Sequence, residues 1–162
     1  RDIDSLTGLY NRRGLDMQLS SLFANPESLG HCAMIMVDAD GLKEINDTYG
    51  HEKGDIYLKK IADMINTFET RNSIVARQGG DEFVVFLYQY EGEKELLEAV
   101  NILDFIRKHC LTYLGEHLRV PLRFSFGYSI FNGEMSYQEM LKIADEQMYE
   151  NKRKRKSQGK KE

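Results

Sequence analysis

Two pairs of acidic residues are the features of this sequence with the clearest chemical potential. Asp38 and Asp40 follow a short apolar run, and Asp81 and Glu82 lie in a turn between two β-type runs. If the turn lies beside the end of the apolar run, the carboxylates converge and repel one another unless a cation neutralises them. Hard oxygen ligands of this kind suit Mg²⁺ or Mn²⁺, usually together with substrate phosphates. Spacing alone is equally consistent with ordinary acidic turn residues.

Glycines and a lysine near these acids are candidates for phosphate binding. Gly79 and Gly80 precede the second acidic pair and allow a close approach of the backbone to a ligand, although many hairpins carry such glycines. Gly41 and Leu42 lie at a strand-to-helix turn before Lys43. Backbone N–H groups at such a turn can cradle a phosphate, and a lysine can add positive charge. A solvated surface lysine is the commoner alternative.

Strands and helices must position these groups, and hydrophobic patterns predict where they lie. The continuous apolar run 32–37 predicts a strand buried on both faces, and runs 74–77 and 83–87 predict a hairpin around the glycine pair. Residues 122–130 alternate as a further strand. Apolar residues at helical spacing predict helices over 11–24, 56–68, 96–106 and 136–148. The order predicts an α/β (α+β) fold in which helices cover both faces of a mixed sheet.

Composition is typical of one ordinary globular domain. The 162 residues are 41% hydrophobic, which suffices for one full core and not for two, so 1–162 is predicted to be a single domain. The basic stretch 152–162 is predicted to be a frayed tail. The formal net charge of −4 gives no indication of nucleic-acid binding.

Sequence features also bear on the cellular setting. No apolar run approaches the roughly 20 residues that cross a bilayer, and no signal peptide opens the chain. Cys32 and Cys110 make no disulfide scaffold, which favours a reducing, cytoplasmic location. The chain begins at Arg1 rather than Met. We therefore expect this chain to be a fragment of a longer signalling protein that has an N-terminal sensory or regulatory domain. This expectation includes a membrane-bound sensor of which the chain is the cytoplasmic part.

Six motifs, in order along the chain, resemble the GGDEF domain, the catalytic domain of diguanylate cyclases. Residues 79–83 match the GGDEF signature letter for letter. The others resemble D-x-L-T-G-L-x-N-R-R at 4–13, D-x-D-x-F-K-x-I-N-D at 38–47, G-H-x-x-G-D at 50–55, S-x-G at 125–127 and A-D-x-x-x-Y-x-A-K at 144–152. The resemblance covers nearly the whole chain and implies a mainly antiparallel sheet, similar to the palm of polymerases and nucleotide cyclases.

This resemblance implies an activity and its partners. GGDEF domains join two GTP molecules into cyclic di-GMP through attack of a 3′-hydroxyl on an α-phosphate, with two pyrophosphates leaving and Mg²⁺ or Mn²⁺ assisting. Each domain holds one GTP, so a second copy of the domain must meet the first face to face. A monomer would bind GTP without turnover, which makes dimerisation the natural point of control.

The resemblance also implies roles for single residues. Asp38 and Asp81 would bind the metal through carboxylates, and Ala39 through its carbonyl. Glu82 would bind metal or help the 3′-hydroxyl lose its proton. With Lys43, the three acids form the implied catalytic set. Asn46 and Asp55 would read the guanine edge. The remaining implied substrate contacts are Gly41, Leu42, Lys43, Gly79, Gly80, Lys152 and Lys156.

The chain departs from the family pattern at several positions. Leu42 stands where Phe is usual, Gln78 where Tyr is common, and Asn151 where Ala is usual. The usual G-R-N near the end is Arg-Lys-Ser at 155–157. Lysine at 156 lacks the bidentate fork of arginine, which puts its phosphate contact in doubt.

One further family feature is missing from this sequence. Many members bind their product at an R-x-x-D motif, whose end positions correspond here to Thr70 and Ser73. Neither residue carries the required charge, and Arg71 is one residue out of register, so no product-inhibition site is expected. Two alternatives to the enzyme remain: a catalytically weak, GTP-binding regulatory GGDEF module and a purely structural dimerisation domain. The intact signature and the acidic pairs favour the enzyme over both.

Overall fold

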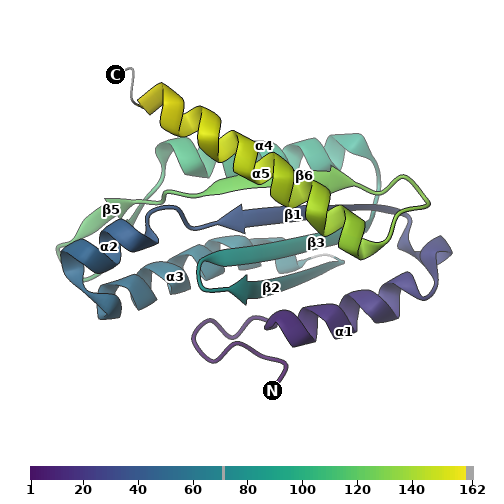
Figure 1. The fold of residues 1–162 in the computed structure, drawn as a ribbon, viewed down its shortest axis with the longest axis horizontal. Helices are drawn as coiled ribbons and strands as arrows, with labels where there is room; N and C mark the ends of the chain where they lie inside the picture. The colour runs from purple at the N-terminus through teal and green to yellow at the C-terminus, as the bar shows by residue number, and fades with distance from the viewer. Residues whose placement is uncertain (71, 160–162) are drawn as a thin grey trace.

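A four-stranded antiparallel sheet lies at the centre of the computed structural model, which describes residues 1–70 and 72–159 (Figure 1). Its strands run in the order β2-β3-β1-β6. They are β1 (His31–Asp38), β2 (Ser73–Gly79), β3 (Glu82–Tyr90) and β6 (Ser125–Ile130). All three strand pairings are antiparallel. The predicted fold class, a mainly antiparallel sheet flanked by helices, is confirmed.

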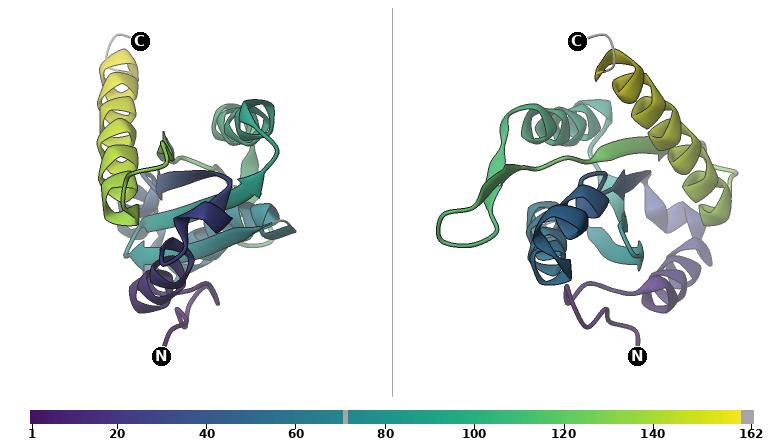
Figure 2. Two further views of the ribbon diagram at one scale, coloured as in Figure 1. Left: turned by 90° about the vertical axis from the view of Figure 1, so that its right-hand side faces the viewer. Right: turned by 60° about the vertical axis from the view of Figure 1, so that its left-hand side comes forward.

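Helices cover both faces of this sheet, as Figure 1 and the edge-on view at the left of Figure 2 show. The main helices are α1 (Arg12–Phe23), α3 (His51–Asn66), α4 (Glu93–His109) and α5 (Tyr137–Gly159). Met34 and Met36 of β1 pack in the cluster containing residues of α1 and α5, whereas Ile35 and Val37 pack with α3 and α4. This alternation explains the continuous apolar run, because both faces of β1 are buried.

Several elements differ from the predicted ones. The structure adds η1 (Pro26–Leu29), α2 (Leu42–Tyr49), η2 (Thr67–Thr70) and a separate hairpin of β4 (Leu111–Tyr113) and β5 (Arg119–Pro121). The loop of that hairpin projects from the body of the domain in Figure 2. The strand predicted over 122–130 begins only at Ser125. Elements of three residues are too short to show a hydrophobic period, and α2 buries only Ile45, so neither gave a clear pattern.

The basic end of the chain also differs from the prediction of a frayed tail from residue 152. Helix α5 continues to Gly159. Within this stretch, Lys152 and Arg155 pair with carboxylates in and just after β1, contacts that tie this part of the helix to the sheet. Within the described residues, no helix is sufficiently long and apolar to cross a membrane.

Gly127 sets how closely α5 approaches the sheet. A Cβ atom at this position in β6 would lie 2.2 Å from the backbone nitrogen of Met148 and 2.6 Å from the carbonyl oxygen of Ala144. Both atoms belong to the helix backbone, so no side chain could rotate away. The missing side chain therefore allows the 144–148 part of α5 to lie directly against β6.

We expect Gly127→Ala to destabilise the domain, since overpacking a well-filled contact costs roughly 1–3 kcal/mol. Equilibrium denaturation by urea measures the loss of unfolding free energy. Gly92→Ala is the matched control, because Gly92 has an extended backbone and no atom lies within 4 Å of a Cβ built there. Equal stabilities of the two variants would contradict the close approach of α5.

Candidate active site

The carboxyl end of β1 is the centre of the candidate site. Asp38 is paired with Glu82 of β3 and with Ser125 of β6. Directly opposed residues of antiparallel strands share a face, so these three side chains lie on the face covered by α1 and α5. The N–H of Ala39 donates to the carbonyl oxygen of Asp81 at 2.8 Å. The structure thus brings together the two acidic pairs that the sequence singled out.

Burial and mutual repulsion characterise these acids. Asp38 is only 8% exposed, and its pKa is raised to about 6, chiefly by burial and also by the charge of Asp81, while Lys152 opposes the rise. Burial also raises the pKa of Glu82, with the charges of Asp145 and Asp81 acting in the same direction. Both carboxyls therefore hold protons more tightly than exposed acids do, and both would gain from a nearby cation.

Two basic side chains of α5 reach these carboxylates. The Nζ atom of Lys152 lies 3.1 Å from Asp38 Oδ2 and 3.2 Å from Asp40 Oδ1. Arg155 donates to Asp40 Oδ2, to the Ser125 hydroxyl oxygen at 2.6 Å and to the backbone carbonyl of Phe124. Lys152 was among the predicted site residues, and Arg155 was not.

A sequence signal for Arg155 existed in its spacing from Lys152. Residues three or four apart lie on the same side of a helix, so this spacing admitted Arg155 and Lys156 alike as companions of Lys152. The prediction instead chose Lys156, one residue later, to accompany Lys152. In the structure Lys156 is exposed. Asp38, Asp40, Asp81 and Glu82 form the acidic cluster of this site. The residue of α5 that reaches this cluster beside Lys152 is therefore Arg155, which stands where the family usually has glycine.

Unpartnered oxygens indicate how a divalent metal would fit. Asp38 Oδ1 and Asp40 Oδ1 are buried and have no hydrogen-bond partner among residues 1–70 and 72–159. The contact of Lys152 with Asp40 Oδ1 is an ion pair without hydrogen-bond geometry. Buried polar atoms of this kind need a cation or donor. No ready-made group of three or more His, Cys, Asp or Glu ligands occurs in the described part of the chain. The residues therefore fit a metal held by one or two carboxylates plus substrate phosphates.

The turn from β1 into α2 holds the predicted phosphate contacts. Helix α2 begins at Leu42, and the first N–H groups of a helix have no partner within the helix. Lys43 is exposed in this first turn, whereas Leu42 is partly buried against the core. The carbonyl of Ala39 accepts a hydrogen bond from the N–H of Leu42 at 3.1 Å and keeps a second lone pair. The turn thus presents donors beside the acidic cluster.

The predicted guanine contacts, Asn46 and Asp55, lie on neighbouring helices. Asn46 is half-buried on α2, and Asp55 is exposed in α3. A Cβ atom on Gly54 would lie 1.7 Å from Asn46 Oδ1, so the Asn46 side chain occupies the space that Gly54 leaves open. The structure therefore brings Asn46 beside the residue that precedes Asp55.

Gly79 and Gly80 form the exposed tip of the β2–β3 hairpin. The carbonyl of Gly80 accepts hydrogen bonds from Arg77 Nε at 3.1 Å and Nη2 at 2.8 Å. Arg77 Nη1 also lies 3.2 Å from Asp4 Oδ1. Arg77 thus ties the signature turn to the N-terminal segment, a role that the sequence did not reveal because arginine in a strand has many possible partners.

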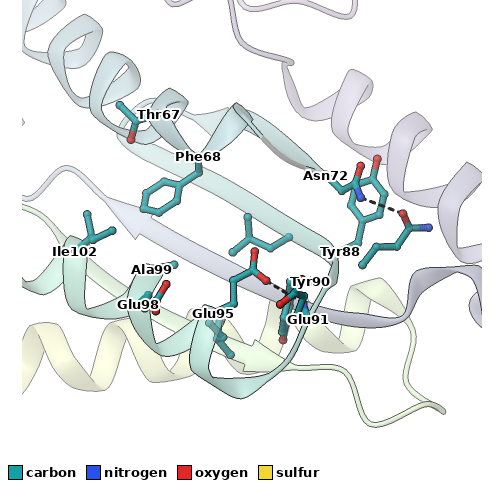
Figure 3. A pocket seen from close by; sticks show the side chains of 13 residues that line it. Thr67, Phe68, Asn72, Tyr88, Tyr90, Glu91, Glu95, Glu98, Ala99 and Ile102 are labelled. Atoms are coloured by element: carbon teal, nitrogen blue, oxygen red, sulfur yellow. Dashed lines mark hydrogen bonds between the residues drawn. The ribbon is translucent and has the colours of Figure 1, made fainter.

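A pocket of about 660 Å³ lies away from this site, between η2, the end of β3 and α4 (Figure 3). Tyr88, Tyr90 and Ile102 are among its lining residues, together with Glu91 and Glu98. None of the predicted catalytic residues lines it. This pocket is therefore separate from the acidic residues at the end of β1.

Known proteins with similar sequences and structures were compared with this chain. The family model for "Diguanylate cyclase, GGDEF domain" matches residues 1–158. The chain is 35% identical over 153 residues to diguanylate cyclase DosC of Escherichia coli K12, covering 93% of this chain and 33% of DosC. It is 32% identical to DgcN of the same organism, covering 94% of this chain and 37% of DgcN. The chain thus spans about a third of these curated relatives.

Solved structures are similar over the same region. The GGDEF domain of YfiN (TpbB) from Pseudomonas aeruginosa is 34% identical with a TM-score of 0.81, covering 94% of this chain and 89% of that one. The GGDEF domain of DgcB from Caulobacter crescentus, solved with c-di-GMP, has a TM-score of 0.83 at 24% identity, covering 94% and 88%. The latter likeness shows the fold alone. With the family model matching 158 residues and the signature at the acidic cluster, the chain belongs to the GGDEF family.

Proposed function

We propose that this domain is a diguanylate cyclase that condenses two GTP molecules into cyclic di-GMP and two pyrophosphates. One observation carries the proposal: the intact signature hairpin places Asp81 and Glu82 against the end of β1, where Asp38 has a buried oxygen without a partner. Such an arrangement suits metal-assisted phosphoryl transfer, in which positioning and charge neutralisation supply most of the catalysis. Membership of a family that includes DosC and DgcN supports the same activity.

Each residue of the site has a proposed part in this reaction. Asp38, Asp81 and the carbonyl of Ala39 would hold Mg²⁺ or Mn²⁺, which when bound neutralises charge on the α-phosphate and the leaving pyrophosphate. Lys43 and the first N–H groups of α2 would bind the β- and γ-phosphates. Glu82 is proposed to accept the proton of the attacking 3′-hydroxyl, since its raised pKa makes it a better base than an ordinary carboxylate.

The reaction as proposed needs two copies of the domain. One domain binds one GTP, and the attacking hydroxyl belongs to the GTP held by the second copy. Two attacks, one on each half, close the ring. We propose a homodimer as the active form and a sensory or regulatory domain outside this sequence as its control, since the chain covers only 33% of DosC.

The test is an assay of the domain with GTP and Mg²⁺, with cyclic di-GMP and pyrophosphate quantified by chromatography. Light scattering measures the dimer fraction in the same samples. We expect the rate per domain to rise with the dimer fraction. GTP binding without cyclic product in samples that are mostly dimeric would instead establish the regulatory, catalytically weak alternative.

We expect no tight product binding next to β2, because the R-x-x-D ends are Thr70 and Ser73. Ser73 belongs to β2 and pairs with Leu87, and Asn72 donates its amide to Gln89 at 3.0 Å (Figure 3). Arg71 lies outside the described residues, and the side chain of Thr70 is not described. Calorimetric titration of cyclic di-GMP, with a non-hydrolysable GTP analogue blocking the active site, is the measurement. Submicromolar binding that Arg71→Ala removes would show that the motif has shifted by one residue.

A further inference from the structure

Arg155, near the end of α5, makes its hydrogen bonds to the acidic cluster and its surroundings, not to residues of its own helix. Arg155 is half-buried, with a side chain 31% exposed. Its guanidinium donates to Asp40, to the Ser125 hydroxyl and to the Phe124 carbonyl, which belong to two other chain segments. A planar guanidinium fork is suited to several acceptors at once, and it stays charged at every accessible pH.

Its neighbours in the same basic stretch behave differently. Lys154 pairs with Glu150 at 3.7 Å, one turn earlier on α5. Arg153 lies over the ring of Tyr149, 5.9 Å from its centroid, also on α5. Both contacts lie along the helix surface and are typical of a solvated helix. The position of Arg155 is therefore not a general property of this basic sequence.

The negative charges of Asp38, at the end of β1, and Asp40, in the turn that follows, are neutralised to different extents. Asp40 Oδ2 accepts from both Arg155 and the Ser125 hydroxyl. Among the described residues, Asp38 has Lys152 as its one basic partner, at Oδ2, and Lys152 also lies 3.2 Å from Asp40 Oδ1. The Oδ1 atoms of both aspartates lack a hydrogen-bond partner, so the difference lies in the arginine that only Asp40 has. Lysine carries its charge on a flexible stem with freely rotating donors, whereas the arginine is fixed by three acceptors. A cation arriving at the cluster can therefore displace Lys152 from Asp38 more readily than Arg155 from Asp40.

We propose that Arg155 is a fixed counter-cation for Asp40. It occupies this carboxylate and so confines the divalent metal to the Asp38 side of the cluster. The inference rests on the proposed metal-dependent function of this site. Arg155 acts through Asp40 and is therefore a positioning residue. Its fixed positive charge lowers the metal affinity of the nucleotide-free domain, and its contacts hold Lys152 within reach of the site. Metal binding then depends on the added charge of the nucleotide phosphates.

The test measures Mn²⁺ binding to the nucleotide-free domain by electron paramagnetic resonance of the free ion. We expect Arg155→Ala to bind Mn²⁺ roughly three- to tenfold more tightly than the unmodified domain, because a nearby unit of positive charge is lost and Asp40 becomes available. Arg155→Gln, which keeps polar hydrogen-bonding atoms without the charge, should show the same direction. Arg155→Lys keeps the charge but loses the fork that fixes it to three acceptors, so it should tighten Mn²⁺ binding less than the two uncharged variants do.

Arg153→Ala is the matched control, since it removes the same residue type two positions away on the same helix. It should leave Mn²⁺ affinity unchanged. If Arg155 only anchored the end of α5, Arg155→Ala would loosen the site and weaken binding, so unchanged or weaker binding in both uncharged variants overturns the inference. A domain that binds no Mn²⁺, with or without a non-hydrolysable GTP analogue, would instead overturn the metal site of the proposed function.

Discussion

Replacing Asp38 or Asp81 by alanine is expected to lower cyclic di-GMP synthesis by about a thousandfold or more while the domain stays folded. A bound metal contributes several kcal/mol of charge stabilisation in the transition state, and each 1.36 kcal/mol is a factor of ten in rate. Asp38 and Asp81 are the proposed carboxylate ligands from the two chain segments that the Ala39–Asp81 backbone hydrogen bond holds together. Losing either ligand should therefore remove most of that stabilisation.

The fold should survive both substitutions. Asp81 joins the sheet through its backbone carbonyl, which alanine also provides. Burial already opposes the charge on Asp38, and Lys152 keeps Asp40 as a partner when Asp38 is removed. Overpacking is excluded because alanine is smaller than aspartate.

The measurement is the initial rate of cyclic di-GMP formation at saturating Mg²⁺ and GTP, with circular dichroism to verify the fold. Asp63→Ala is the control, because Asp63 is an exposed acid on α3 that takes no part in the cluster. Its rate should match the unmodified domain. Near-normal turnover in a folded Asp38 or Asp81 variant would place the catalytic metal elsewhere.

The parts of this site that could be predicted from the sequence are those set by local pattern. The apolar run ending at Asp38 predicts a doubly buried strand, and the glycine pair before Asp81 predicts a hairpin tip. Both elements occur as predicted. Their side-by-side placement needed one assumption, that the hairpin is central. The strand order bears this out for β3, which lies next to β1, whereas β2 is the edge strand. Charge repulsion then suggested a cation without any knowledge of the structure.

The parts that could not be predicted depend on distances between elements far apart in the chain. Arg155 reaches Asp40 across 115 positions of sequence, and only the closeness of α5 to β6 makes the contact possible. That closeness depends in turn on Gly127, whose role as a packing contact cannot be distinguished in sequence from a turn or bulge glycine. Gly54 is a similar case, because its partner Asn46 belongs to α2, a helix for which the hydrophobic pattern gave no clear signal.

Base selectivity is the second large expected effect. We expect kcat/KM for GTP to exceed that for ATP by roughly tenfold to a hundredfold, since a buried polar group left unpaired costs about 1–3 kcal/mol. The carboxylate of Asp55 can accept from the N1 and N2 hydrogens of guanine, a pattern that adenine does not offer. Asp55 is exposed in the free domain, so the penalty arises only when a bound base covers it. Steady-state kinetics with each nucleotide measures the ratio, and comparable synthesis of cyclic di-AMP from ATP would refute it.

Gly54→Ala should reduce this selectivity without unfolding the domain. The new methyl group would lie only 1.7 Å from Asn46 Oδ1 if nothing moved, and the end of the Asn46 side chain can rotate away to relieve the clash. Alanine is also a better helix former than glycine, which offsets part of the strain in α3. We therefore expect a higher KM for GTP and a smaller GTP-to-ATP ratio, with thermal stability nearly unchanged. Lys60→Ala, at an exposed position of the same helix, should leave both values unaltered. An unchanged ratio in Gly54→Ala would mean that Asn46 does not contact the base, and selectivity would then rest on Asp55 alone.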